Sequence, residues 1–308
     1  MPIKVNADLP AVSTLEKENI FVMTDKRAAT QDIRPLKIAI VNLMPTKETT
    51  ETQLLRLLGN TPLQIEISLV RMEHHTSKNT DEAYLEKFYI PSNELFSQKF
   101  DGMLVTGAPV EQIAFESVDY WDELCAIMDY AKENVYSTLY LCWGSFAGLY
   151  HHYGIKKYPL ERKMSGIFMN YRTTESDPLL RGFDDTFPIP QSRHTTLHKE
   201  DVLACKQLTI LAESAEAGVT IVKSKDNREI FMTGHLEYDT ETLAGEYFRD
   251  TDKGMSVPLP KNYFPTNNVC REPLNYWRST AHLFYSNWLN YYVYQQTPFE
   301  LSSIERTK

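Results

Sequence analysis

The feature that most constrains the fold is a regular alternation of short apolar runs with amphipathic stretches between residues 37 and 154. Apolar runs rich in β-branched side chains predict buried strands, and leucine or aromatic residues at helical spacing predict helices. The predicted strands cover 37–44, 64–72, 101–107 and 137–144, and the predicted helices cover 50–59, 118–133 and 145–154. Because strands that alternate with helices pair in parallel, we expect an α/β fold with a mostly parallel sheet flanked by helices.

The segments on either side of this alternation differ from it. Residues 1–34 are polar and contain Pro2 and Pro10, so we expect an irregular N-terminal arm that packs on the body. Beyond residue 165 the helical pattern weakens, and further strand and helix candidates lie at 208–213, 219–223, 229–234, 239–250 and about 274–294. No Gly-, Pro- or Ser-rich linker divides the rest of the chain, so residues 35–308 are predicted to form a single α/β domain.

Composition argues against several functional classes. The 308 residues carry a formal net charge of −9, which provides no general attraction for nucleic acid or anionic lipid. There is no apolar run of 18 residues and no apolar core in the first twenty, so we expect neither a transmembrane helix nor a signal peptide. The four cysteines are widely spaced and form no CxxC pair, which argues against a disulfide framework or a structural zinc site. We therefore expect a cytoplasmic protein that binds neither nucleic acid nor membranes.

Cys142 follows the predicted strand TLYL, and Gly144 and a predicted helix come directly after it. A sharp strand-to-helix turn of this kind exposes a nucleophile above the carboxyl edge of the sheet. The helix N-terminus favours the thiolate form of a cysteine, and its free backbone N–H groups, that of Trp143 among them, are expected to stabilise an oxyanion. The alternative is a buried structural cysteine, because free cysteine is among the most buried residue types.

A candidate base follows another predicted strand, EIFM, where the sequence TGHLEYD places His235 and Glu237 on a loop. A thiol nucleophile needs an imidazole to take up and return its proton, and the imidazole needs a carboxylate to fix its tautomer. His235 and Glu237 are suited to these two roles. The alternatives are an incidental histidine in a turn, or a metal site, for which no third or fourth ligand stands at a recognisable spacing. We therefore expect no metal ion.

A third strand end, TGAPVEQ at 106–112, is rich in small residues. Gly107 and Ala108 allow backbone N–H groups to approach the cysteine and to complete an oxyanion hole. In open α/β sheets the binding crevice lies outside the carboxyl ends of the strands. Three strand ends place Gly107, Cys142 and His235 on one rim, the carboxyl edge of the sheet. Together they indicate an active site more specifically than any one of them does.

Together these motifs resemble those of class I glutamine amidotransferases, and the whole chain is similar to the homoserine O-acyltransferases of methionine biosynthesis. The first resemblance is carried by Cys-Trp-Gly at 142–144, by GHLEYD and by the elbow-type sheet. The second runs from MPIKV to WLNYYVYQQTP, with matching segments at 33–45, 50–64, 100–110, 181–185, 191–194 and 247–250. Both imply a class I glutamine amidotransferase-like (flavodoxin-like) fold with a nucleophile elbow.

The resemblance implies a role for each matching residue. Cys142 would carry the acyl group as a thioester, His235 would accept the proton, and Glu237 would be the partner of His235. Lys163, Ser192 and Arg249 match the positions that contact substrate in the family. The motifs alone do not single out these three residues. Homoserine has a carboxylate, for which Lys or Arg is the natural partner. The resemblance further implies a cytoplasmic homodimer that uses no metal ion or prosthetic group.

The family divides by acyl donor at the residue just after GAPV, which is Gly in succinyl-transferring members and Glu in acetyl-transferring ones. This chain has Glu111 there, so Glu111, together with Ser192, is the expected determinant of donor choice. The implied reaction is ping-pong transfer of an acetyl group from acetyl-CoA, a co-substrate, to the hydroxyl of L-homoserine. The alternatives are succinyl transfer, a glutamine amidohydrolase, and a non-enzymatic binding protein on the same fold.

Overall fold

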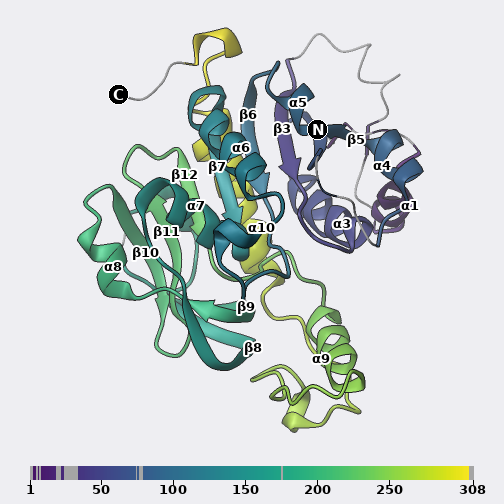
Figure 1. The fold of residues 1–308 in the computed structure, drawn as a ribbon, viewed down its shortest axis with the longest axis vertical. Helices are drawn as coiled ribbons and strands as arrows, with labels where there is room; N and C mark the ends of the chain where they lie inside the picture. The colour runs from purple at the N-terminus through teal and green to yellow at the C-terminus, as the bar shows by residue number, and fades with distance from the viewer. Residues whose placement is uncertain are drawn as a thin grey trace.

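The computed structural model describes residues 3–4, 6, 8–18, 22–23, 34–73, 75, 79–174 and 176–304. Within this part of the chain a twelve-stranded sheet runs in the order β2-β1-β4-β3-β6-β7-β12-β11-β10-β8-β9, with β5 beside β4 (Figure 1). Seven of its eleven strand pairings are parallel, which confirms the predicted mostly parallel α/β fold.

The parallel part of the sheet contains the strands that the sequence predicts most clearly. These strands are β3 (Leu36–Val41), β4 (Ile65–Arg71), β6 (Phe100–Val105), β7 (Val135–Leu141) and β12 (Glu229–Met232). The short strand β5 (Tyr89–Pro91), which the sequence does not predict, pairs with β4. Successive side chains of β3 point to opposite faces, so Ile38 and Ile40 join one apolar cluster while Ala39 and Val41 join another. Burial on both faces explains why these strands read as continuous apolar runs.

Helices cover both faces of this parallel part. One face packs against α3 (Lys47–Leu58) and α10 (Arg278–Asn287), and the other against α6 (Trp121–Asn134) and α7 (Trp143–Tyr153). The aromatic segment near the C-terminus continues α10 as a π-helix, Trp288–Tyr294, and the indole of Trp288 donates to Ser137 Oγ of β7 at 3.0 Å. This segment therefore packs in the core. Two short helices, α4 (Glu82–Phe88) and α5 (Ser92–Leu95), flank β5.

Antiparallel strands extend the sheet beyond β12. They are β11 (Gly218–Ser224), β10 (Leu208–Ser214), β8 (Tyr158–Arg172) and β9 (Thr186–Thr196), with α8 (Lys199–Ala204) after β9. The sequence predicts β10, β11 and β12 but not the long pair β8–β9, because the first half of β8 is largely exposed and polar and lacks an alternating pattern. Helix α9 (Thr242–Asp252) lies below the sheet in Figure 1, near β8 and β9.

The N-terminal arm is more regular than the sequence predicts. Its described residues form α1 (Pro10–Lys17) and two short strands, β1 (Ile3–Lys4) and β2 (Val22–Met23). Strand β1 pairs with β4, and α1 buries Leu15 in the core. The expectation of an irregular arm is therefore wrong for these residues, since a proline at the first helical position favours a helix start. Residues 24–33 of the arm lie outside the described part of the chain, and the division at residue 34 stays a prediction.

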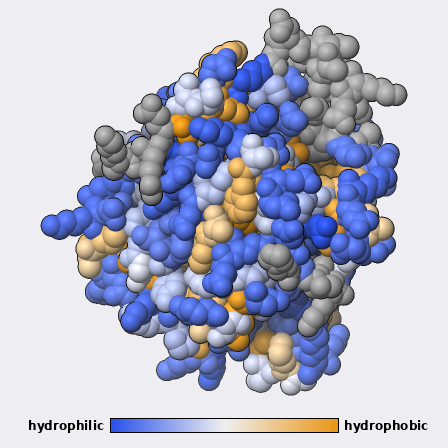
Figure 2. Space-filling model, turned by 45° about the horizontal axis from the view of Figure 1, so that its top comes forward, coloured by the Kyte–Doolittle hydropathy of each residue, from blue (hydrophilic) through white to orange (hydrophobic). Residues whose placement is uncertain are grey.

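The face of the molecule in Figure 2 is mostly hydrophilic, with small groups of hydrophobic residues between the polar ones. Among the residues that the structure describes, no helix has both the length and the apolar composition needed to cross a membrane.

Candidate active site

Cys142 occupies a sharp turn between β7 and α7. Its backbone has φ 47° and ψ −117°, a conformation that costs free energy for any residue with a side chain. The turn is held by its surroundings: the Cys142 N–H donates to the carbonyl of Met232 at 2.7 Å, and the Cys142 carbonyl accepts from Ser145 N at 2.9 Å. The hydroxyl of Ser145 also hydrogen-bonds the carbonyls of Tyr140 and Met232. Strain that is held this firmly is typical of functional sites.

The glycines near this turn allow the end of β6 to approach it. A Cβ added to Gly144 would lie 2.7 Å from the carbonyl oxygen of Thr106, too close for any side chain. A Cβ added to Gly107 would lie 3.7 Å from Cys142 Sγ. Gly107 and Ala108 therefore lie beside the thiol, as the sequence predicts. Their role in an oxyanion hole, and that of the Trp143 N–H, stays a prediction.

His235 and Glu237 form a buried pair just past the end of β12. Imidazole Nδ1 lies 2.6 Å from Glu237 Oε1, and the side chains are 4% and 7% exposed. Burial alone would lower the pKa of His235, but the adjacent Cys142 and the Glu237 carboxylate outweigh it and raise this pKa well above its ordinary value. The His235 ring also hydrogen-bonds Cys142, so thiol, imidazole and carboxylate form a continuous row. This is the arrangement that a base-activated nucleophile needs.

Tyr238 and Glu246 connect this row to helix α9. The ring of Tyr238 stacks on His235 with centroids 4.0 Å apart, and its hydroxyl donates to Glu246 Oε1 at 2.8 Å. The other carboxylate oxygen of Glu246 accepts from Ser192 Oγ and lies 3.3 Å from Lys163 Nζ. Neither residue is among the site residues predicted from the sequence. Tyr238 lies within the GHLEYD motif, but Glu246 has no sequence signal, because its partners come from distant strands.

Lys163, Ser192 and Arg249 gather around Glu246 and Asp250, two of the carboxylates of α9. Lys163 Nζ donates to Asp250 Oδ2 at 2.9 Å, and Arg249 Nε donates to Asp250 Oδ1 at 2.9 Å. Burial would raise the pKa of Asp250, but these two cations lower it below its usual value. The three positions that resemble substrate contacts in the family thus form one charged cluster.

Arg193 is a further charged group that the sequence analysis missed, although it lies within the QSRH motif. It is 1% exposed and donates to the carbonyl oxygens of Thr195 and Ala217 and to the side-chain oxygen of Gln191. Burial lowers its pKa to about 10, while Cys142 and Glu111 act in the opposite direction. At neutral pH Arg193 therefore keeps a buried positive charge near Cys142 and Glu111.

These groups meet in one cavity of about 560 Å³. The residues that line it include Gly107, Ala108, Glu111, Cys142, Lys163, Ser192, His235, Tyr238, Glu246, Arg249 and Asp250. Apart from Trp143 and Glu237, which lie behind this surface, every site residue expected from the sequence lines the cavity. Glu111 reaches it from the loop after β6, and its Oε2 accepts from the backbone N–H of His194 at 2.6 Å.

Comparison with known proteins identifies the family. The model of the family described as homoserine O-succinyltransferase matches residues 2–299. The chain belongs to this family. It is 57% identical over 306 residues to the homoserine O-acetyltransferase of Brevibacillus brevis, a match that covers 99% of this chain and 100% of the relative. It is 55% identical over 306 residues to the homoserine O-acetyltransferase of Petrotoga mobilis, covering 99% of each.

Two solved structures with similar folds are glutamine amidotransferases. The enzyme from Methylobacillus flagellatus has a TM-score of 0.54 at 11% identity, covering 84% of this chain and 95% of that one. A glutamine amidotransferase from Thermotoga maritima has a TM-score of 0.54 at 12% identity, covering 83% and 98%. At such identities the likeness concerns the fold alone. It confirms the predicted class I glutamine amidotransferase-like fold.

Proposed function

We propose that the protein is a homoserine O-acetyltransferase that works through a thioester on Cys142. The observation that carries the proposal is the Cys142–His235–Glu237 row, which opens into a cavity whose wall also carries both cations and carboxylates. Such a wall suits a zwitterionic amino acid. Relatives at 55–57% identity over nearly the whole chain are named homoserine O-acetyltransferase, which supports the same reaction.

In the first half-reaction the Cys142 thiolate attacks the thioester carbonyl carbon of acetyl-CoA. Backbone N–H groups near Gly107 and Trp143 are proposed to stabilise the oxyanion. When the tetrahedral intermediate collapses, the bond between this carbon and the CoA sulfur breaks, and protonated His235 gives its proton to the departing thiolate. The raised pKa of His235 favours the protonated imidazole that this step requires.

In the second half-reaction homoserine enters the cavity and attacks the acyl group. Neutral His235 takes the proton of the homoserine hydroxyl as its oxygen attacks the thioester carbon. The bond from this carbon to Cys142 Sγ then breaks, which releases O-acetyl-L-homoserine and restores the thiolate and protonated imidazole. Glu237 holds Nδ1 throughout, so that Nε2 faces the reacting atoms.

Recognition of the amino acid is assigned to the charged cluster on β8, β9 and α9. The homoserine carboxylate is proposed to bind Lys163 and Arg249, which are the cations of the cavity wall. The ammonium group is proposed to bind Glu246, whose carboxylate faces the same cavity and connects to His235 through Tyr238. Ser192 orients Glu246 by a hydrogen bond. In this proposal the substrate competes for groups that pair with one another in the free protein.

Acetyl rather than succinyl transfer is proposed because Glu111 lines the cavity beside Cys142. A succinyl group carries a terminal carboxylate, and two like charges about 4 Å apart repel by about 4 kcal/mol at an effective dielectric near 20. Half of this repulsion already exceeds the roughly 1.4 kcal/mol that a tenfold preference requires. We expect Glu111→Gly to gain activity with succinyl-CoA and to lose its preference for acetyl-CoA.

The mechanism is tested by intact-mass measurement after exposure to acetyl-CoA without homoserine. One acetyl group should appear and map to Cys142, and Cys142→Ala should remain unlabelled. Label elsewhere, or near wild-type turnover by Cys142→Ala, would contradict the proposal. A parallel assay of glutamine hydrolysis tests the rival amidohydrolase activity, which the shared fold suggests. We expect one equivalent of CoA to be released without homoserine, continued CoA release only when homoserine is present, and no glutaminase activity.

We further propose that the protein acts as a cytoplasmic homodimer, with acetyl-CoA as a co-substrate and without a metal ion or bound cofactor. The support for the cytoplasm is that all four cysteines are free thiols, as a reducing compartment requires. The family resemblance supports the dimer. Light scattering coupled to size-exclusion chromatography would measure the mass, and a monomer at working concentration would contradict this part of the proposal.

A further inference from the structure

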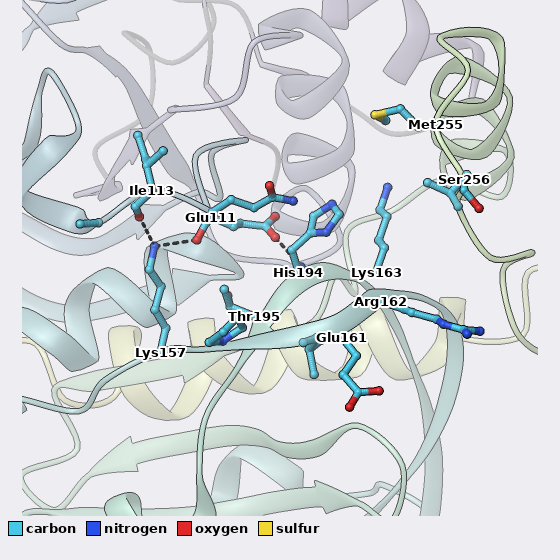
Figure 3. A pocket seen from close by; sticks show the side chains of 15 residues that line it. Glu111, Ile113, Lys157, Glu161, Arg162, Lys163, His194, Thr195, Met255 and Ser256 are labelled. Carbon is cyan, nitrogen blue, oxygen red and sulfur yellow. Dashed lines mark hydrogen bonds between the residues drawn. The ribbon is translucent and has the colours of Figure 1, made fainter.

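Lys157 holds the loop that presents Glu111. It precedes β8, and Figure 3 shows its side chain reaching up to the loop. Its Nζ donates to the carbonyl oxygens of Glu111 at 2.7 Å and of Ile113 at 2.6 Å. The same ammonium group lies 4.2 Å from the ring centroid of Phe115. One side chain thus ties two backbone carbonyls and an aromatic ring of this loop to the start of β8.

The carboxylate of Glu111 is held separately by strand β9. The pairing of β8 with β9 is interrupted by a register shift, because Pro159 pairs with Thr195 while Met164 pairs with Arg193. His194 has no partner on β8 in this register, so its N–H is free to donate to Glu111 Oε2 at 2.6 Å (Figure 3). An interrupted strand pairing beside an active site often serves to redirect one group in this way.

The loop held by Lys157 lines two neighbouring cavities. A cavity of about 700 Å³ is lined by Lys157, Glu111 and His194, and it shares Glu111 and His194 with the cavity that contains Cys142. Glu111 therefore stands where the two cavities meet. An acyl group that reaches Cys142 through the larger cavity would pass this carboxylate.

We propose that Lys157 is a positioning residue for acyl-donor selectivity, a role that rests on the proposed acetyltransferase function. Charge repulsion falls with distance, so Glu111 excludes a succinyl carboxylate only while its own carboxylate stays at the cavity. Lys157 fixes the main chain of Glu111, and the His194 N–H fixes its side chain. Without Lys157 the loop has no side-chain cation on the carbonyls of Glu111 and Ile113, and the Glu111 carboxylate moves toward solvent.

The test is the ratio of kcat/KM for acetyl-CoA to kcat/KM for succinyl-CoA, with homoserine as acceptor. Lys157→Met should lower this ratio by roughly fivefold or more, since repulsion weakens as the carboxylate moves away and becomes solvated. Lys157→Arg should restore most of the ratio, because a guanidinium can also donate to two carbonyl oxygens. Lys156→Met is the matched control, an exposed neighbouring lysine whose loss should leave the ratio unchanged.

A double variant separates positioning from direct contact with the donor. If Lys157 acts through Glu111, adding Lys157→Met to Glu111→Gly should leave the donor ratio of Glu111→Gly unchanged. A further independent change in the double variant would overturn the proposal. So would an unaltered ratio in folded Lys157→Met, or in Lys157→Gln if the methionine variant does not fold.

The failures of the two proposals are distinguishable. If the wild type transfers neither acyl group to homoserine, the proposed function itself is wrong. If the wild type prefers acetyl-CoA and Glu111→Gly shifts the donor ratio while Lys157→Met does not, only the role of Lys157 is overturned. An unchanged ratio in Glu111→Gly would also overturn it, because Lys157 would then have no selector to position.

Discussion

The reacting groups and the binding groups of the cavity come from two regions that are built differently. Cys142 and His235 follow the parallel strands β7 and β12, where backbone hydrogen bonds and close packing fix them. Lys163 and Ser192 lie on the antiparallel pair β8–β9, where contacts with the Glu246 carboxylate fix them instead. The first region is held by the main chain, and the second by charged side chains that a bound substrate can also engage. Substitutions in the two regions should therefore affect different steps.

The largest effect is expected from the row at the parallel strand ends. His235→Ala should lower kcat by roughly a thousandfold or more, as for the loss of a base in other triads. Glu237→Ala should be less harmful, since Glu237 orients the imidazole and does not react. Rapid-quench measurement of CoA release and of product formation should show both half-reactions impaired in His235→Ala. If Glu237→Ala is as active as the wild type, another group must orient the imidazole.

A smaller and more selective effect is expected in the antiparallel region. Lys163→Met should raise the KM for homoserine about 10- to 100-fold, because a charge-assisted contact contributes about 1.5–3 kcal/mol. Acyl-enzyme formation from acetyl-CoA should change far less. Lys206→Met, which removes an exposed lysine elsewhere, is the control. A defect confined to acyl-enzyme formation would mean that Lys163 contacts the acyl donor. The two regions would then not act on different steps.

A buried lysine in the parallel region provides a pH test of the difference between the two regions, because among the described residues it has no ion pair with a carboxylate like those of Lys163. Lys47 is 8% exposed, and its ammonium donates to the Asn42 carbonyl at 2.6 Å and lies over the ring of Tyr89. Burial lowers its pKa from 10.5 to about 8, although Glu51 opposes the change. Lys163, by contrast, contacts two carboxylates.

The sign of the pH effect follows from proton binding. Below pH 8 the folded and unfolded states both carry charged Lys47, and burial of that charge reduces the free energy of unfolding. Above pH 8 the folded state loses the proton first, so stability rises with pH. Between pH 8 and 9.5 the free energy of unfolding of the wild type should rise by about 1.6 kcal/mol relative to Lys47→Met. Urea titrations at several pH values would measure this, and a constant difference would mean that Lys47 is not desolvated.

The last comparison concerns two glycines, one in each region. Gly144→Ala should destabilise the protein by about 1–3 kcal/mol, because the added methyl group meets the Thr106 and Val105 carbonyls. Gly245→Ala in α9 meets no atom within 4 Å and should stabilise it by about 0.5–1 kcal/mol through helix propensity. Thermal unfolding of both variants measures the two changes in stability. Equal and small effects would show that the turn at Cys142 is less tightly packed than its contacts indicate.

The sequence predicts the parallel region well because its signals are local. A strand buried on both faces appears as an apolar run, and a nucleophile elbow appears as a strand, a cysteine and a glycine in direct succession. Strands β8 and β9 were missed because β8 is half exposed and its apolar and polar residues do not alternate. The sequence does not predict helix α1, because Pro10 also fits an interruption of the chain, although it is the first residue of that helix.

The sequence alone determined which side chains stand at strand ends, and so placed Gly107, Cys142 and His235 on one rim. Only the tertiary structure decided what faces them. Glu246 meets Ser192 and Lys163 across separations of 54 and 83 residues, and no local pattern encodes such contacts. The same holds for the Glu111 carboxylate, whose donor is a backbone N–H that becomes available only where the β8–β9 register shifts. Groups without a periodic or adjacent signal become visible only when the chain has folded and distant strands have paired.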